Sequence, residues 1–164
     1  MKKVLNRILL VVAAAVLIFA LSLPLLRAPR PDGHVRCVNH LKHIAVGLTM
    51  YAHENEGWYP PELGTLLEEG YLDDPFTFQC PKAASRIQME VEDWSKLPSD
   101  YVYCGATPQE DVTSETPLVA DCPCNHRTGG WVVMGDGHVD WFENPEFTDI
   151  YVKITQARKQ EMRE

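Results

Sequence analysis

The clearest pattern of apolar and polar positions lies over residues 35–54. Its apolar residues recur at spacings of three and four, which places them on one face of an α-helix: Val38, Leu41, Ala45, Leu48 and Ala52. Three further apolar side chains flank this stripe, namely Cys37, Ile44 and Tyr51. The polar residues fall on the other side, and Gly57 follows as a helix terminator. We therefore predict an amphipathic helix over residues 35–54 with one buried face.

A second pattern, over residues 126–142 (HRTGGWVVMGDGHVDWF), predicts a β-hairpin. Residues 131–134 are apolar and β-prone, residues 135–137 form a tight Gly-Asp-Gly turn, and residues 138–142 run back. An Asp-Gly pair between two such runs is a strong hairpin signal, because glycine takes the positive φ that the turn needs. Val139 and Trp141 share one face of the return strand and Asp140 lies on the other, so we expect one solvated face.

The other elements are shorter. Residues 101–104 and 117–120 predict two strands, residues 62–69 predict a short helix with Pro61 at its first position, and residues 145–164 predict a C-terminal helix. Helices and strands are thus segregated, which favours an α+β domain over residues 35–144: one amphipathic helix packed on a small antiparallel sheet. Four aromatic residues are expected to pack in its core and strands: Trp58, Tyr59, Trp131 and Trp141.

The N-terminal region is apolar. Residues 8–26 contain no charge over 19 positions, about the length that spans a hydrocarbon core as a helix. We therefore predict residues 1–26 as a transmembrane anchor, with a cleaved signal as the alternative, and residues 27–34 as a linker. Lys2, Lys3 and Arg7 precede the run, which favours a single pass through the inner membrane with the domain in the periplasm.

Charge narrows the class of partner. The 164 residues carry a formal charge of −8, and all 23 acidic residues lie beyond residue 30. Residues 31–164 hold ten basic residues against those 23, a formal charge of −13. Such a surface repels phosphate, so we expect no binding of nucleic acid.

Four ordered segments carry a family resemblance. His126, nine residues and Asp136-Gly137 make an H-x9-DG signature. It is preceded by CVNHLKHIAVGLTMYAHENEGWYPP from Cys37, by LGTLLEEGYL, and by FQCP around Cys80. Over roughly residues 35–142 the chain resembles the bacterial prepilin-type processing-associated proteins, relatives of the G-type pseudopilins of type II secretion and of type IV pilins. The resemblance implies a pilin-like fold anchored in the inner membrane and a structural or assembly role beside other pseudopilin or secretion-system subunits.

The resemblance implies a structural or assembly role rather than catalysis, so we expect no catalytic residue; we also expect no cofactor, with calcium or zinc as alternatives. The chain departs from the family in having no Gly-Phe-Thr-Leu-Ile-Glu type prepilin-peptidase site and no glutamate at the start of its apolar run. Two roles therefore remain as alternatives: an assembly subunit, or a fixed, anchored relative of such subunits. The alternative function is an exported metal- or ligand-binding module that keeps the pilin-like fold without entering a filament.

Five cysteines make disulfides plausible in an exported domain: Cys37, Cys80, Cys104, Cys122 and Cys124. Cys104 and Cys122 lie at the ends of neighbouring predicted strands, so we expect them to pair. Cys37 and Cys80 form the second expected pair, which would join the long helix to the loop beyond it. The alternative is that several cysteines stay reduced and pack.

Metal binding is a further alternative. Zinc could use Cys122, Cys124 and His126 together with His138 or Cys104, although Pro123 limits how the Cys122 and Cys124 sulfurs converge. His40 and His43 could share a ligand but are expected to face solvent. Calcium could bind the acidic loop over residues 105–121 through its carboxylates: Glu110, Asp111, Glu115 and Asp121.

We interpret the signature residues His126 and Asp136 as structural. We expect His126 to hydrogen-bond across the base of the hairpin and Asp136 to cap its own turn, next to Gly137. A hydrolase would use His126 and Asp136 as an acid–base pair, but the sequence shows no activated nucleophile with an orienting partner.

Overall fold

The computed structural model describes residue 12 and residues 33–83 and 98–161. The chain divides into two compact units, residues 1–31 and 32–164, and the fold below is that of the second unit. Within the described residues, no helix is both long and apolar enough to cross a membrane. The anchor predicted over residues 1–26 lies outside them, apart from Val12, which is helical.

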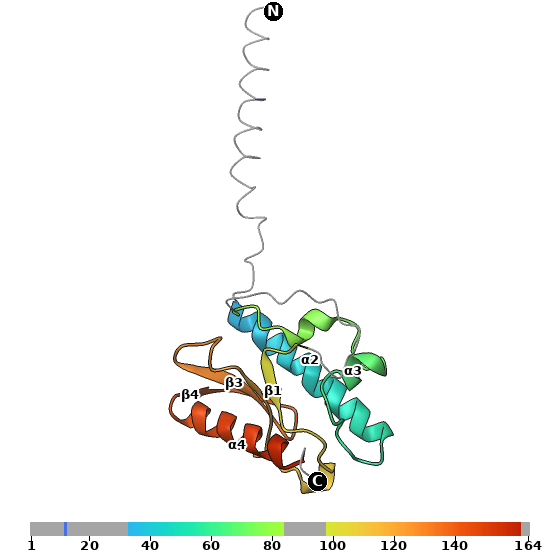
Figure 1. Ribbon diagram of the computed structural model, residues 1–164. Coiled ribbons are helices and arrows are strands. Elements are labelled where there is room, and N and C mark those ends of the chain that lie inside the picture. Colours follow the sequence, from blue (N-terminus) through green and yellow to red (C-terminus); the bar gives the residue numbers. More distant parts are fainter. Residues whose placement is uncertain (1–11, 13–32, 84–97, 162–164) are drawn as a thin grey trace, which may run out of the picture. The chain divides into compact units, whose positions relative to one another are not determined.

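The second unit contains four strands, three α-helices and two short 3₁₀ turns among its described residues (Figure 1). In chain order they are α2 (Gly33–Glu54), α3 (Thr65–Glu68), η1 (Pro75–Phe78), β1 (Tyr101–Tyr103), η3 (Gln109–Asp111), β2 (Pro117–Asp121), β3 (Gly129–Met134), β4 (Val139–Glu143) and α4 (Glu146–Glu161). The α+β class and the order of the elements are confirmed. Residues 33–34, predicted as linker, belong to α2.

The sheet is antiparallel and follows the chain in the order β1-β2-β3-β4. Strands β3 and β4 form the predicted hairpin, with Trp131 opposite Trp141 and Val133 opposite Val139. Gly137 has φ +83° in the turn, a conformation that glycine adopts without steric cost. The expectation for Asp136 is confirmed, because its Oδ1 accepts a hydrogen bond from the backbone N–H of His138 at 3.1 Å.

Helix α2 lies on one face of the sheet as predicted. Its stripe is buried at Leu41, Ala45 and Leu48, in one core with Tyr103 and Val133 of the sheet. The helix ends where expected: Gly57, with φ +83°, donates its N–H to the carbonyl oxygen of Ala52 at 2.8 Å.

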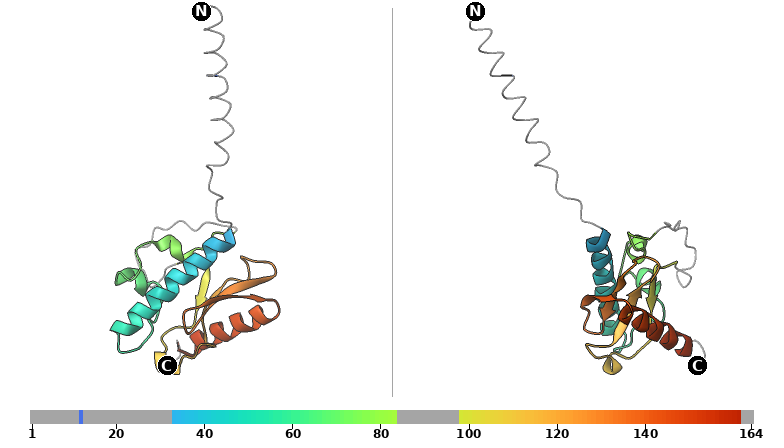
Figure 2. Two further views of the ribbon diagram at one scale, coloured as in Figure 1. Left: turned by 180° about the vertical axis from the view of Figure 1, so that it is seen from behind. Right: turned by 90° about the vertical axis from the view of Figure 1, so that its left-hand side faces the viewer.

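Helix α4 covers the other face, so the sheet lies between two helical layers (Figures 1 and 2). Phe147 and Ile154 of α4 form a second core with Ala120, Val132 and Met134. The expectation of one solvated face is therefore wrong. Its physical reason lies in β3, where Val132 and Val133 are consecutive and both fully buried, which requires cover on both faces.

The segment between α2 and α3 also differs from expectation. Tyr59 donates its N–H to Thr107 O at 3.0 Å, and the Tyr103 hydroxyl donates to Pro60 O at 2.8 Å. These bonds hold residues 59 and 60 against the segment around β1. A bend and a turn follow over residues 61–64, and α3 begins at Thr65 and not at Pro61. Trp58 is half exposed, which corrects its expected place in the core, whereas Trp131 and Trp141 pack edge to face.

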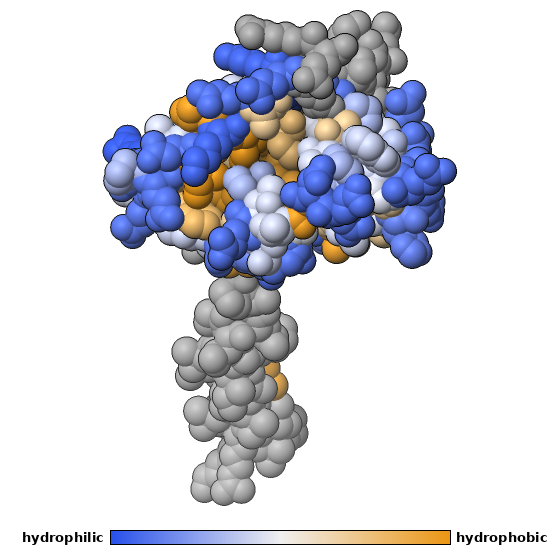
Figure 3. Space-filling view, turned by 90° about the horizontal axis from the view of Figure 1, so that it is seen from below, coloured by the Kyte–Doolittle hydropathy of each residue, from blue (hydrophilic) through white to orange (hydrophobic). Residues whose placement is uncertain are grey.

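Hydrophilic side chains predominate among the coloured residues on the face that Figure 3 shows. In Figure 3, which shows one face of the molecule, hydrophobic residues gather in a hollow bordered by hydrophilic ones. Large exposed hydrophobic side chains within residues 33–83 and 98–161 are few: Val35, Val46, Met50, Trp58, Phe76 and Val152. Three of these residues belong to α2.

Candidate functional site

Four buried side chains with chemically reactive groups converge at the N-terminal part of α2. Cys37 comes from α2, Cys80 follows η1, Asp121 ends β2, and His126 lies between β2 and β3. One sulfur, oxygen or nitrogen atom of each lies within 4.8 Å of all the others. We call these four residues the Cys–Asp–His cluster. None of the four is more than 7% exposed, so the cluster is closed to solvent.

The cluster joins segments that local hydrogen bonds hold in place. Cys37 lies on the buried stripe of α2, one turn before Leu41. The backbone N–H of Cys80 donates to Asp100 Oδ2 at 2.8 Å, and the N–H of Asp100 donates to Phe78 O at 3.0 Å. These two bonds tie the segment after η1 to the start of β1.

Asp121 is oriented by its other oxygen. Its Oδ1 accepts hydrogen bonds from the backbone N–H of Cys122 at 2.9 Å and from Asn125 Nδ2 at 2.7 Å. Oδ2 therefore faces the cluster, where it lies 2.9 Å from His126 Nε2.

The distances within the cluster are short. The sulfurs of Cys37 and Cys80 lie 3.1 Å apart. The Cys80 sulfur lies 3.8 Å from His126 Nε2 and 3.9 Å from Asp121 Oδ2. Cys80 thus contacts all three other groups. The expected Cys37–Cys80 disulfide is not formed in this structure, where both residues are free thiols, although their sulfurs lie in contact.

We expected His126 to hydrogen-bond across the base of the hairpin. Its side chain instead turns toward Asp121. Its ring packs 4.9 Å from that of His34 and meets Trp141 edge-on at 5.4 Å. Asp136 and Gly137 lie at the opposite end of β3, which is about 20 Å long at roughly 3.3 Å per residue. The H-x9-DG signature therefore marks both ends of one hairpin and not a single site.

Hydrogen bonding and burial act on the pKa values of the cluster. The hydrogen bond to Asp121, and next that to Cys80, raises the pKa of His126 to about 9, although burial opposes this. The hydrogen bond between the sulfurs lowers the pKa of Cys37, and the same bond, with burial, raises the pKa of Cys80. The raised pKa favours the protonated form of His126 beside Asp121, and of the two cluster sulfurs Cys37 has its pKa lowered and Cys80 has its pKa raised.

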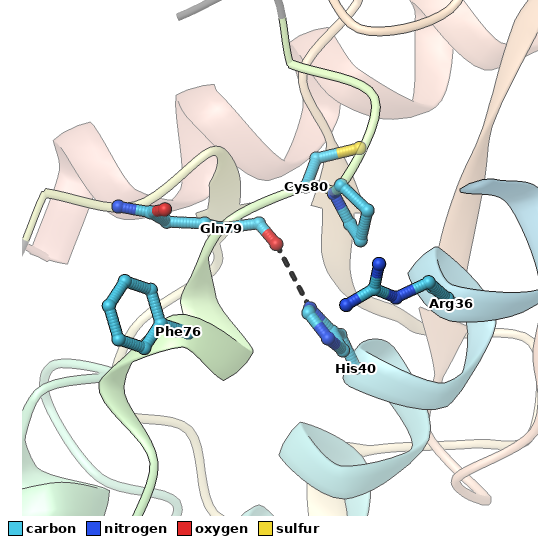
Figure 4. Close-up of a pocket in the computed structure, with 6 residues that line it drawn as sticks. Arg36, His40, Phe76, Gln79 and Cys80 are labelled. Carbon is cyan, nitrogen blue, oxygen red and sulfur yellow. Dashed lines mark hydrogen bonds between the residues drawn. The ribbon is translucent and has the colours of Figure 1, made fainter. Parts of the chain in front are cut away.

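A cavity of about 270 Å³ lies beside the cluster and is lined by Arg36, His40, Phe76, Gln79, Cys80 and Pro81. Figure 4 shows Arg36, His40 and Phe76 around this space, whereas the sulfur of Cys80 points away from them. His40 Nδ1 donates to Gln79 O at 2.9 Å, and burial lowers the pKa of its imidazole. His40 is thus partly buried, contrary to expectation, whereas His43 is exposed.

The expected Cys104–Cys122 disulfide is wrong, because Cys122 pairs with Cys124 and Cys104 forms no disulfide. Strands β1 and β2 are antiparallel, so the end of one lies beside the start of the other. Cys104 N–H bonds to Leu118 O, and Cys122 N–H bonds to Asp100 O. The two cysteines are therefore separated by four residues of strand, about 13 Å. Pro123 also does not keep the Cys122 and Cys124 sulfurs apart.

The zinc set expected from the sequence is dispersed. Cys122 and Cys124 are bonded to each other and His126 turns to the cluster. His138 lies beyond the far end of β3, where Nδ1 contacts Asp136 and Nε2 lies 3.3 Å from Asp140 Oδ2.

The expected calcium set is dispersed as well. Glu110, Asp111 and Glu115 are exposed, whereas Asp121 is fully buried in the Cys–Asp–His cluster. All four cluster residues were thus candidates from the sequence, but Asp121 and His126 were assigned to different sites from the expected Cys37–Cys80 pair. The one usable signal was that Asp121 and His126 are close in sequence at the end of a strand.

The cluster can do two kinds of chemistry. The two sulfurs can oxidise to a disulfide, or all four groups can coordinate one cation. No family model, curated protein or solved structure matched the chain, so this assignment depends on the geometry alone.

Proposed function

We propose that this protein is a non-enzymatic, membrane-anchored, pseudopilin-like subunit that acts in a type II secretion or type IV pilus-like assembly. Its domain lies on the periplasmic side of the inner membrane, and its partners are other subunits of that assembly. The proposal joins the sequence resemblance to one structural observation, the outer face of α2.

That outer face carries exposed apolar side chains at helical spacing. Val35, Val46 and Met50 are 49%, 58% and 47% exposed. At 100° per residue they lie within about 60° of one another, opposite the stripe that packs on the sheet. Polar residues such as Asn39 separate them along the helix. An apolar row on a helix already packed on its other side suits a contact with a helix of a neighbouring subunit.

Burial of the reactive groups supports a non-enzymatic role. Cys37 and Asp121 are fully buried and His126 is 7% exposed, so a substrate does not reach them. The cavity beside them is lined by the partly buried His40, whose Nδ1 is already bonded to Gln79 O. Catalysis by a nucleophile requires an accessible group with an adjacent base. Neither the buried Cys–Asp–His cluster nor His40 in the neighbouring cavity meets this requirement.

Photo-crosslinking in cells tests the proposal. A photoreactive amino acid at Val46 or Met50 should join the protein to other subunits of the assembly or to a second copy. The matched control is Val152 on α4, which is 45% exposed but lies on another surface. Recovery of monomer alone from positions 46 and 50, or equal crosslinking from position 152, would contradict a helix-mediated assembly role.

A further inference from the structure

We propose that Cys37, Cys80, Asp121 and His126 bind one zinc ion, which joins α2 to the sheet. Thiolates, imidazole and carboxylate are the ligand types that zinc takes in proteins. The carboxylate beside two thiolates favours zinc over copper(I), which prefers soft sulfur ligands. The site does not depend on the assembly role and would be present in either an assembly subunit or a fixed relative.

The spacing of the ligand atoms fits a tetrahedral ion. Bonds of roughly 2.0–2.3 Å to zinc place the four ligand atoms about 3.3–3.8 Å from one another. The separations that involve Cys80 are 3.1, 3.8 and 3.9 Å, and Asp121 Oδ2 lies 2.9 Å from His126 Nε2. No two of the four atoms are more than 4.8 Å apart. Small side-chain adjustments are therefore enough to accommodate the ion.

The surrounding residues orient the ligands in advance. The two hydrogen bonds to Asp121 Oδ1, from Cys122 N–H and Asn125 Nδ2, direct Oδ2 toward the other three groups. The rings of His34 and Trp141 pack against His126, and Nε2 of His126 faces Asp121 and Cys80. Metal ligands in proteins are typically held by such second contacts, which fix their orientation.

A Cys37–Cys80 disulfide is the competing use of the two sulfurs. It would employ neither the carboxylate nor the imidazole, yet both are deeply buried and lie within 4 Å of the Cys80 sulfur. Burial of such a pair is costly unless the pair has well-placed partners. Coordination of one ion uses all four groups, and complete burial of the set suits a structural site without an open position.

Zinc analysis of the full-length chain, purified in detergent with a thiol reductant, tests the proposal. After incubation with Zn²⁺ and removal of excess, mass spectrometry should find about one zinc ion per chain. Cobalt(II) in its place should give the visible absorption of tetrahedral thiolate coordination. Cys37→Ser and Cys80→Ser should each retain about a tenth of the zinc or less, and Asn125→Ala should bind it about 10–100-fold more weakly.

The matched control is Cys104→Ser, which removes a cysteine outside the cluster that forms no disulfide and should leave the zinc content unchanged. Cys124→Ser and His138→Ala test the zinc set that was expected from the sequence, and both variants should also keep the zinc ion. Because a variant can fail to fold, the wild-type chain is also alkylated: Zn²⁺ should protect Cys37 and Cys80 but not Cys104.

Three results would overturn the proposal. They are no zinc uptake by the reduced wild-type chain, full zinc content in both Cys37→Ser and Cys80→Ser, and a Cys37–Cys80 disulfide as the state trapped by alkylation in cells. A fourth result would overturn it as well: loss of zinc from Cys124→Ser with retention in Cys80→Ser would place the ion at Cys124 and not in the Cys–Asp–His cluster.

Discussion

The contact between Gly130 of β3 and Phe147 of α4 provides a sharp test of the three-layer architecture. Phe147 is fully buried, and a Cβ added at Gly130 would overlap its ring, with Cε1 only 2.6 Å away. The three nearest atoms to that Cβ all belong to Phe147. Gly130 therefore leaves space for one particular side chain of the helix that covers the second face.

Each single substitution should destabilise the domain. Phe147→Ala removes a fully buried ring and should lower the free energy of unfolding by about 3–5 kcal/mol. Gly130→Ala pushes on that ring and should cost about 1–3 kcal/mol. In the double variant the vacated space accepts the new methyl group, so Gly130→Ala should then cost little or even stabilise, by up to about 1 kcal/mol, because alanine restricts the unfolded chain.

Urea denaturation of the four proteins measures this coupling, which should be about 0.5–3 kcal/mol for residues in contact. Gly129→Ala is the matched control: its Cβ would overlap the carbonyl oxygen of Phe142, a backbone atom, so Phe147→Ala should not relieve its cost. Additive effects of Gly130→Ala and Phe147→Ala would refute the packing of α4 against β3.

Three further predictions concern other parts of the domain. Leu41→Ala, in the buried stripe of α2, should lower the free energy of unfolding in urea by about 2–5 kcal/mol. Val46→Ala, on the outer face of α2, should change it by less than about 0.5 kcal/mol. Equal losses in the two variants would contradict the assigned faces. Arg158 Nη2 lies 2.6 Å from Glu62 Oε2 at a partly exposed site, so Glu62→Gln should cost at most about 1 kcal/mol, and raised salt should remove the difference. Hydrogen bonds from His138 lower the pKa of Asp136 below 3.8, so its contribution to stability is present above that value and is lost as pH falls through the folded pKa. The stability difference between wild type and Asp136→Asn should therefore shrink in acid; a difference that is constant from neutral to strongly acidic pH would argue against this bond.

Local patterns were enough to locate the main elements. The spacing of Leu41, Ala45 and Leu48 predicted α2, because a helical face depends only on residues three or four apart. The Asp136-Gly137 turn predicted the β3–β4 hairpin for a similar reason, since positive φ is a property of the turn residue itself.

The cover of the second sheet face by α4 was not predicted, although the sequence of β3 contains a local indication of it. Consecutive side chains of a strand point to opposite faces, so the apolar run from Trp131 to Met134 required cover on both. The solvated face was inferred instead from Asp140, which lies on the edge strand β4, where α4 leaves it exposed.

Local sequence patterns predicted the type and order of the elements and the buried face of α2, and Cys37 and Cys80 were expected to pair. Tertiary packing places Asp121 and His126 beside these cysteines and holds Cys104 and Cys122 apart, and neither arrangement was predicted. The physical reason is range: helical and strand periodicity acts over a few residues, whereas Cys80 lies 43 residues from Cys37 and 46 from His126. Packing of α2 on the sheet, and the antiparallel direction of β1 and β2, bring some of these groups together and separate others.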